Sequence, residues 1–142
     1  MITLKPKEMA TSIFINLPVK DLEKTKEFFL KLGYTYNKQF TDEKAAALVI
    51  SENIYAMLIT EPFFKTFIPD KEIADTGKTK EVLIALSADS KQQVDELVEK
   101  AIAAGGKKFR DPEDHGFMYA RSFEDLDGHV WELFWMNPGH IQ

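Results

Sequence analysis

The strongest constraint on the fold of this sequence is an order of elements that occurs twice. In each half, a β-prone run leads to an aspartate in a helix N-cap position, then to an amphipathic helix and a glycine stop. The two aspartates are Asp21 and Asp89, and the stops are Gly33 and the pair Gly105-Gly106. Because the order repeats without residue identity, the sequence predicts two structural modules of one kind.

The first module is predicted to span about residues 11–61. Its opening run, Thr11 to Val19, alternates between two sets of side chains with the two-residue period of a strand. Three further β-prone runs follow the helix, and their short connections predict antiparallel neighbours at 34–41, 44–51 and 54–61. The predicted order is βαβββ.

The second module is predicted over about residues 79–136, after a linker at 62–78 that Pro62, Pro69 and Gly77 interrupt. One strand precedes its helix, and three short strands follow, at about 107–110, 117–123 and 129–136. The order βαβββ therefore occurs again.

The expected fold class is α+β, in a single domain covering residues 1–142. We expect the two βαβββ modules to form a curved, partly open mixed sheet around a cavity. A ferredoxin-like or other α+β sandwich with the same element order is the alternative.

Composition excludes several classes of function. The net charge is −5 and no basic stripe is present, which argues against a nucleic-acid partner. No segment approaches the ~20 apolar residues of a membrane span, and residues 1–10 do not read as a signal peptide. The chain has no cysteine, so any metal site must use His, carboxylate, amide or water ligands. We expect a cytoplasmic protein.

Two stretches, LPVKDLEKTKEFFLKLGY at 17–34 and RSFEDLDGHVWELFW at 121–135, resemble the vicinal oxygen chelate superfamily. That superfamily includes glyoxalase I, extradiol dioxygenases, fosfomycin-modifying enzymes and bleomycin-binding resistance proteins. The resemblance covers nearly the whole chain and implies the fold described above. It leaves the chemistry open, because one fold supports many functions.

The resemblance also implies four positions from which the enzymes of the superfamily hold a divalent metal. One is Glu132, while the other three fall on Phe14, Val82 and a position near Met57. These three side chains provide no oxygen or imidazole donor. We therefore expect no metal or other cofactor. The alternative is a bound divalent metal, with Glu132 as its ligand.

The histidines offer few further candidates. His115 lies on a probable loop, as a candidate general base or unusual ligand or simply as a solvated residue. His129 and Glu132 stand three apart, so on one strand their side chains point to opposite faces. Glu132 itself is a candidate acid-base residue if it is buried.

The predicted ligand site is a mostly apolar pocket with few polar groups, the usual composition of small-molecule sites. Its residues are expected to be Phe14, Asn16, Met57, Val82 and Phe134, together with Glu132. Tyr119 and Arg121 share a face and, if that face lines the cavity, can bind an anionic or carbonyl-bearing ligand. Alternatively, these side chains simply fill the space between curved strands.

Three functions follow from these patterns. The first is a homodimeric small-molecule-binding protein without metal chemistry. The second is a metal-dependent lyase or dioxygenase that uses Glu132 with His115, Glu81 or a ligand from a second subunit. The third is an interaction module with no ligand. The sequence leaves open whether any reaction is catalysed.

Overall fold

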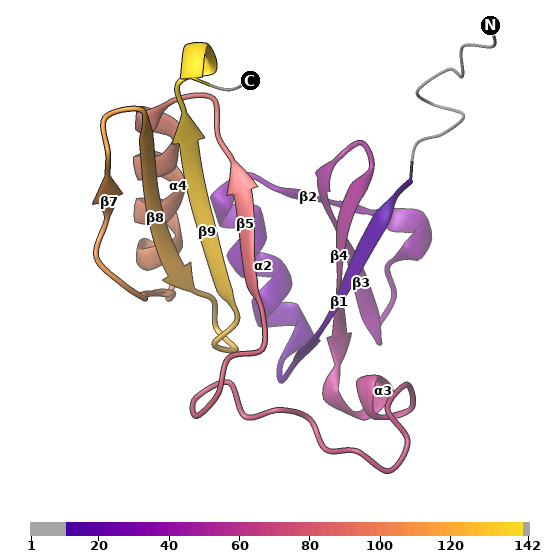
Figure 1. Ribbon diagram of the computed structural model, residues 1–142. Helices are drawn as coiled ribbons and strands as arrows, with labels where there is room; N and C mark the ends of the chain where they lie inside the picture. The colour runs from indigo at the N-terminus through magenta and orange to yellow at the C-terminus, as the bar shows by residue number, and fades with distance from the viewer. Residues whose placement is uncertain (1–10, 141–142) are drawn as a thin grey trace, which may run out of the picture.

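The computed structural model describes residues 11–140, and it contains two α/β modules side by side (Figure 1). The expected absence of a signal peptide in residues 1–10 lies outside the described residues. The first module comprises β1 (Ile13–Val19), α2 (Leu22–Leu32), β2 (Thr35–Asn37), the 3₁₀ turn η1 (Lys38–Phe40), β3 (Ala45–Ser51) and β4 (Ile54–Thr60). A short helix, α3 (Glu61–Lys65), begins the connection to the second module.

The second module repeats this order with one strand split in two. It comprises β5 (Leu83–Ser87), α4 (Lys91–Ala103), β6 (Lys107–Lys108), β7 (Glu113–Asp114), β8 (Met118–Glu124) and β9 (Val130–Met136), and η2 (Pro138–His140) follows. The βαβββ order therefore occurs twice, as predicted. Both β6 and β7 pair with β8, so residues 109–112 interrupt a single edge strand.

The strands form two mixed sheets, one for each module. Their orders are β1-β4-β3-β2 and β5-β9-β8-β6, with β7 also on β8. In each sheet the first strand lies parallel to the last, and the other pairs are antiparallel. Because β1 and β5 are edge strands, the described strands form two open sheets rather than one continuous sheet.

Helix α2 begins and ends at the residues that the sequence predicts. The Asp21 carboxylate accepts a hydrogen bond from the backbone N–H of Lys24 at 3.1 Å. Gly33 ends the helix with a φ of 104°, a left-handed conformation that glycine adopts without steric cost.

The cap of α4 differs from the prediction by one residue. Ser90, rather than Asp89, is the N-cap, and its hydroxyl accepts from the backbone N–H of Gln93 at 3.0 Å. The Gln93 side chain in turn accepts from the backbone N–H of Asp89 at 2.6 Å. This reciprocal pair resembles a capping box, which explains why the helix begins one residue later.

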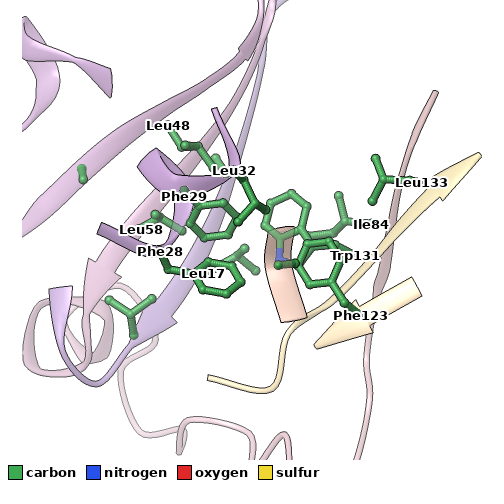
Figure 2. Close-up of a cluster of buried hydrophobic side chains, with 14 of the residues drawn as sticks. Leu17, Phe28, Phe29, Leu32, Leu48, Leu58, Ile84, Phe123, Trp131 and Leu133 are labelled. Carbon is green, nitrogen blue, oxygen red and sulfur yellow. The ribbon is translucent and has the colours of Figure 1, made fainter. Parts of the chain in front are cut away.

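The main hydrophobic core is shared by the two modules, and α2 lies at its centre (Figure 2). Phe29 of α2 is fully buried, and its ring meets that of Trp131 on β9 edge to face, with centroids 5.3 Å apart. Phe28 lies beside Phe123 of β8, with centroids 6.1 Å apart. Aromatic packing therefore joins the first module's helix to the second module's sheet.

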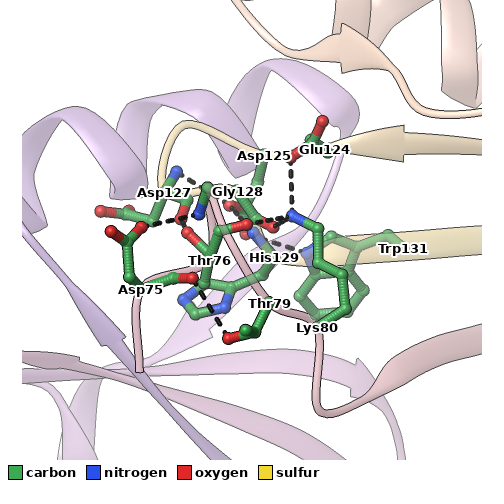
Figure 3. Close-up of polar contacts among 11 residues, drawn as sticks. Asp75, Thr76, Thr79, Lys80, Glu124, Asp125, Asp127, Gly128, His129 and Trp131 are labelled. Carbon is green, nitrogen blue, oxygen red and sulfur yellow. Dashed lines mark hydrogen bonds and ion pairs between the residues drawn. The ribbon is translucent and has the colours of Figure 1, made fainter. Parts of the chain in front are cut away.

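The turn between β8 and β9 is built around the buried carboxylate of Asp125 (Figure 3). One oxygen accepts from the backbone N–H groups of Asp127 and His129 at 2.9 and 3.0 Å, and the other accepts from the Trp131 indole at 2.9 Å. Burial raises the pKa of the Asp125 carboxyl, and these donors oppose the rise by stabilising the charged form.

The same turn also binds the first module. The Asp127 carboxylate accepts from the backbone N–H of Lys20 at 2.8 Å and from the Thr25 hydroxyl at 3.3 Å. The His129 Nε2 donates to the carbonyl of Pro18 at 2.7 Å. His129 is therefore a buried bridge between the modules.

No described helix is long and apolar enough to cross a membrane.

We expect Phe29→Ala to lower the free energy of unfolding by about 3–5 kcal/mol, because it leaves a cavity in the shared core. Urea denaturation followed by circular dichroism measures the change. The control is Leu30→Ala on the same helix, where the side chain is 53% exposed, and we expect a change within about 0.5 kcal/mol. Equal losses in the two variants would contradict the central place of Phe29.

Candidate functional site

Each sheet has one face turned away from the core, and these two open faces carry most of the predicted site residues. On the first sheet, Phe14 and Asn16 of β1 pair with Tyr55 and Met57 of β4. The rings of Phe14 and Tyr55 stack with centroids 4.7 Å apart and planes 7° apart. Phe14, Asn16 and Met57 therefore share the first open face.

The second open face carries Glu132 and Phe134 of β9. Ala85 of β5 lies in register with Glu132, so the β5 residue that shares this face two positions earlier is Leu83. Val82 precedes the strand, and a shift of one residue reverses the face of a strand. Leu83, which is 51% exposed, thus occupies the open-face position that was predicted for Val82.

Glu132 is held by a residue that the sequence did not indicate. The Arg110 guanidinium lies in the interruption between β6 and β7 and binds the carboxylates of both Glu132 and Glu113. Burial lowers the pKa of Arg110, but the two carboxylates outweigh this effect and raise it above its usual value. Glu132 is therefore an ion-paired residue whose side chain is only 14% exposed.

Ser122 is a second residue that sequence reasoning missed. It pairs with Glu132 across β8 and β9, so the two side chains share the second open face. Its buried hydroxyl has no hydrogen-bond partner in the described part of the chain. A buried polar group without a partner is uncommon, because it loses its hydration without compensation.

His115 lies at the surface and does not contact Glu132. Its side chain is 53% exposed, and its Nε2 lies 3.4 Å from an oxygen of Glu113. Its ring stacks on Phe117 at 6.2 Å. Since Arg110 binds both glutamates, His115 is connected to Glu132 only through Glu113 and Arg110.

Tyr119 and Arg121 lie on the other face of β8, against α4. The Tyr119 hydroxyl donates to Asp95 at 2.6 Å, and Arg121 donates to Asp95 at 3.0 Å and to Glu99 at 2.8 Å. These two residues were expected to bind a ligand only if their face of the strand lined the cavity. That face packs against α4 instead. Which face a strand residue takes depends on where the helix packs, and the sequence of β8 alone leaves this undetermined.

The residues at the four expected metal positions do not fit a metal centre. Phe14, Met57 and Val82 provide no oxygen or imidazole donor, nor does Leu83, which takes the place of Val82 on the strand, and Glu132 is bound to Arg110. Nor does any group of three or more His, Asp or Glu side chains within residues 11–140 have an arrangement that could hold a metal ion.

Asn16 of the first open face and Val82 also share a second site. Both line a cavity of about 310 Å³ at the end of the molecule where β1 ends and β9 begins. Val82 thus belongs to a cavity between the modules rather than to an open face.

The sequence of the chain matches a family model described as the glyoxalase/bleomycin resistance protein/dioxygenase superfamily over residues 12–133. The chain belongs to this superfamily. The resemblance to vicinal oxygen chelate proteins is therefore confirmed. No curated protein matches the sequence.

Solved structures support the superfamily fold. Hypothetical protein SA1046 from S. aureus is 28% identical with a TM-score of 0.75, over 92% of this chain and 99% of that one. A superfamily enzyme from Burkholderia phytofirmans PsJN is 18% identical with a TM-score of 0.75, over 89% and 99%. The fosfomycin resistance protein FosX from Listeria monocytogenes is 22% identical with a TM-score of 0.63, over 92% and 96%.

The contacts of Asp95 with Tyr119 and Arg121 predict a contribution to stability that is lost in acid. The hydrogen bond from Tyr119 lowers the pKa of Asp95; desolvation opposes this and Arg121 adds to it. The ionised carboxylate therefore stabilises the fold above its unfolded pKa, and this stabilisation is lost as the pH falls through the lower folded value.

We expect Asp95→Asn to lower stability at neutral pH by less than about 1 kcal/mol, because the half-exposed carboxylate is screened by solvent. Stability should also fall less in this variant than in the parent between about pH 5 and pH 2. Urea titrations across this range measure both effects. The control is Glu96→Gln, one residue along the same helix. If the free energy of unfolding falls as steeply with pH in Asp95→Asn as in this control, Asp95 does not supply the acid-sensitive stabilisation.

Proposed function

We propose that this protein binds a small organic molecule on its open faces, without a metal ion or other cofactor. The observation that carries the proposal is the chemistry of four positions: Phe14, Met57 and Leu83 are apolar, and Glu132 is paired with Arg110. Mostly apolar walls with a few placed polar groups are typical of small-molecule sites.

The polar groups of the second open face favour a ligand with a carbonyl or hydroxyl group. The Arg110–Glu132 pair supplies donors and acceptors, and Ser122 adds a hydroxyl beside them. On the first open face, the stacked rings of Phe14 and Tyr55 provide a flat wall for an apolar or aromatic part.

We further propose that a second copy of the chain completes the site. The edge strands β1 and β5 expose large apolar side chains, with Ile13 50%, Phe14 46% and Leu83 51% exposed. Exposed edges of this kind are usually covered in proteins, and a twofold pair covers equivalent surfaces on both copies. We also propose a cytoplasmic location for this homodimer, which the lack of cysteine suits.

Native mass spectrometry before and after treatment with a chelator tests the function. The expected result is a metal-free dimer that retains or accepts an organic ligand. A divalent ion that is lost on chelation, and that Glu132→Gln fails to bind, would overturn the proposal. That outcome would favour the metal-dependent lyase or dioxygenase, with Glu132 released from Arg110.

The dimer is tested by Ile13→Arg, which places a charge on the exposed edge of β1. We expect this variant to be monomeric at micromolar concentration in light scattering, with an unchanged circular dichroism spectrum. The control is Leu30→Arg, because Leu30 is equally exposed but lies on α2, and it should stay dimeric. A dimer that survives Ile13→Arg would show that the edge of β1 is not the interface.

A further inference from the structure

The cavity of about 310 Å³ lies between the modules. Asn16 of the first open face lines it, whereas Phe14 and Glu132 do not. Its walls come from the end of β1, the start of β9 and the long segment between α3 and β5, which crosses the bottom of Figure 1. Most of the wall is apolar, with Leu17, Pro18, Phe64, Ile73, Val82 and Val130. The volume is at the lower end of the range for small-molecule sites.

Two polar groups at the wall, Lys80 and His129, are already paired with protein groups. The Lys80 ammonium donates to the carbonyls of Thr76 and Gly128 at 2.6 and 2.7 Å and to Glu124 at 2.8 Å, which uses its three protons (Figure 3). The His129 Nε2 is occupied by Pro18. Lys71, Glu72 and Glu81 also line the cavity, but they are exposed to solvent. Neither Lys80 nor His129 therefore offers a free counter-charge to a charged ligand, which would lose its hydration in the apolar part of the cavity.

Asn16 differs from Lys80 and His129 because it keeps an acceptor without a protein partner among residues 11–140. Its amide nitrogen donates to the carbonyl of Phe14 at 3.2 Å, while its side-chain oxygen accepts no hydrogen bond within the described residues. This oxygen offers an acceptor beside an apolar wall.

The long segment is fixed where it meets the turn before β9. The Thr76 hydroxyl donates to the Asp127 carbonyl, and a Cβ on Gly128 would lie 2.5 Å from that hydroxyl oxygen. Gly128 also has a φ of 81°. A side chain at this position would therefore be strained and would displace Thr76, and the hydrogen bond of Thr76 ties the wall segment to the turn without a ligand.

We propose that this cavity binds a small, uncharged, mostly apolar molecule that donates one hydrogen bond to the side-chain oxygen of Asn16. The inference goes beyond the open-face function, because the walls of this cavity all come from one chain. The ligand is of the size of a two-ring aromatic compound with one hydroxyl or N–H group.

Three probes of the same shape test the chemistry: 2-naphthol, naphthalene and 2-naphthoate, each titrated into the ¹⁵N-labelled full chain and followed by NMR. We expect 2-naphthol to bind about tenfold tighter than naphthalene, the effect of one net hydrogen bond. Asn16→Leu should remove this difference and leave naphthalene binding unchanged. Binding of 2-naphthoate as tight as that of 2-naphthol would overturn the proposal.

A second variant locates the site. Val82→Trp should fill the cavity and weaken binding of both neutral probes at least tenfold, whereas Leu30→Trp on the exposed face of α2 should not. Thermal melts check that both variants fold, since Val82 is 47% exposed. Undiminished binding in a folded Val82→Trp would place the probes elsewhere and overturn the proposal.

The monomeric Ile13→Arg variant separates this inference from the proposed function. Retained naphthol binding in the monomer supports a cavity within one chain, whatever the open faces bind. Loss of binding in the folded monomer would overturn the inference and assign the probes to the surface between two copies.

Discussion

The arrangement of the two modules depends on one buried carboxylate. Asp125 is only 5% exposed, and it is tolerated because two backbone N–H groups and the Trp131 indole donate to it. The turn that it shapes presents Asp127 and His129 to the first module. The same hydrogen bonds orient Trp131 against Phe29, so the polar and apolar contacts between modules form one unit. Removing the carboxylate would therefore disturb both kinds of contact.

Much of the fold was predictable from local patterns. The cap at Asp21, the stop at Gly33 and the alternation along β1 each depend on neighbours in sequence, and the βαβββ order was correct in both halves. The error at the start of α4 was also local, because Asp89 and Ser90 are both good caps and only the reciprocal bond with Gln93 decides between them.

The site was less predictable, since it depends on faces and long-range pairs. Whether Val82 or Leu83 faces outward is decided by the register of β5 on β9. The contact of Arg110 with Glu132 joins residues 22 apart and needs the interruption between β6 and β7, which no periodicity indicates. The motif around Glu132 thus identified the superfamily correctly, while the partner that neutralises this glutamate could be found only in three dimensions.

The lengths of the sheet edges have a consequence for how many chains can associate. The outer edges are short, three residues in β2 and two each in β6 and β7, whereas the inner edges, β1 and β5, have seven and five. Lys107, Lys108 and Pro112 further blunt the outer edge of the second sheet. Strand addition at both ends of a molecule would build a fibre, but among the strands of residues 11–140 only the inner edges are long enough for an extended ladder. These edge lengths are what the proposed homodimer requires, in which two copies pair and leave no long edge for a third.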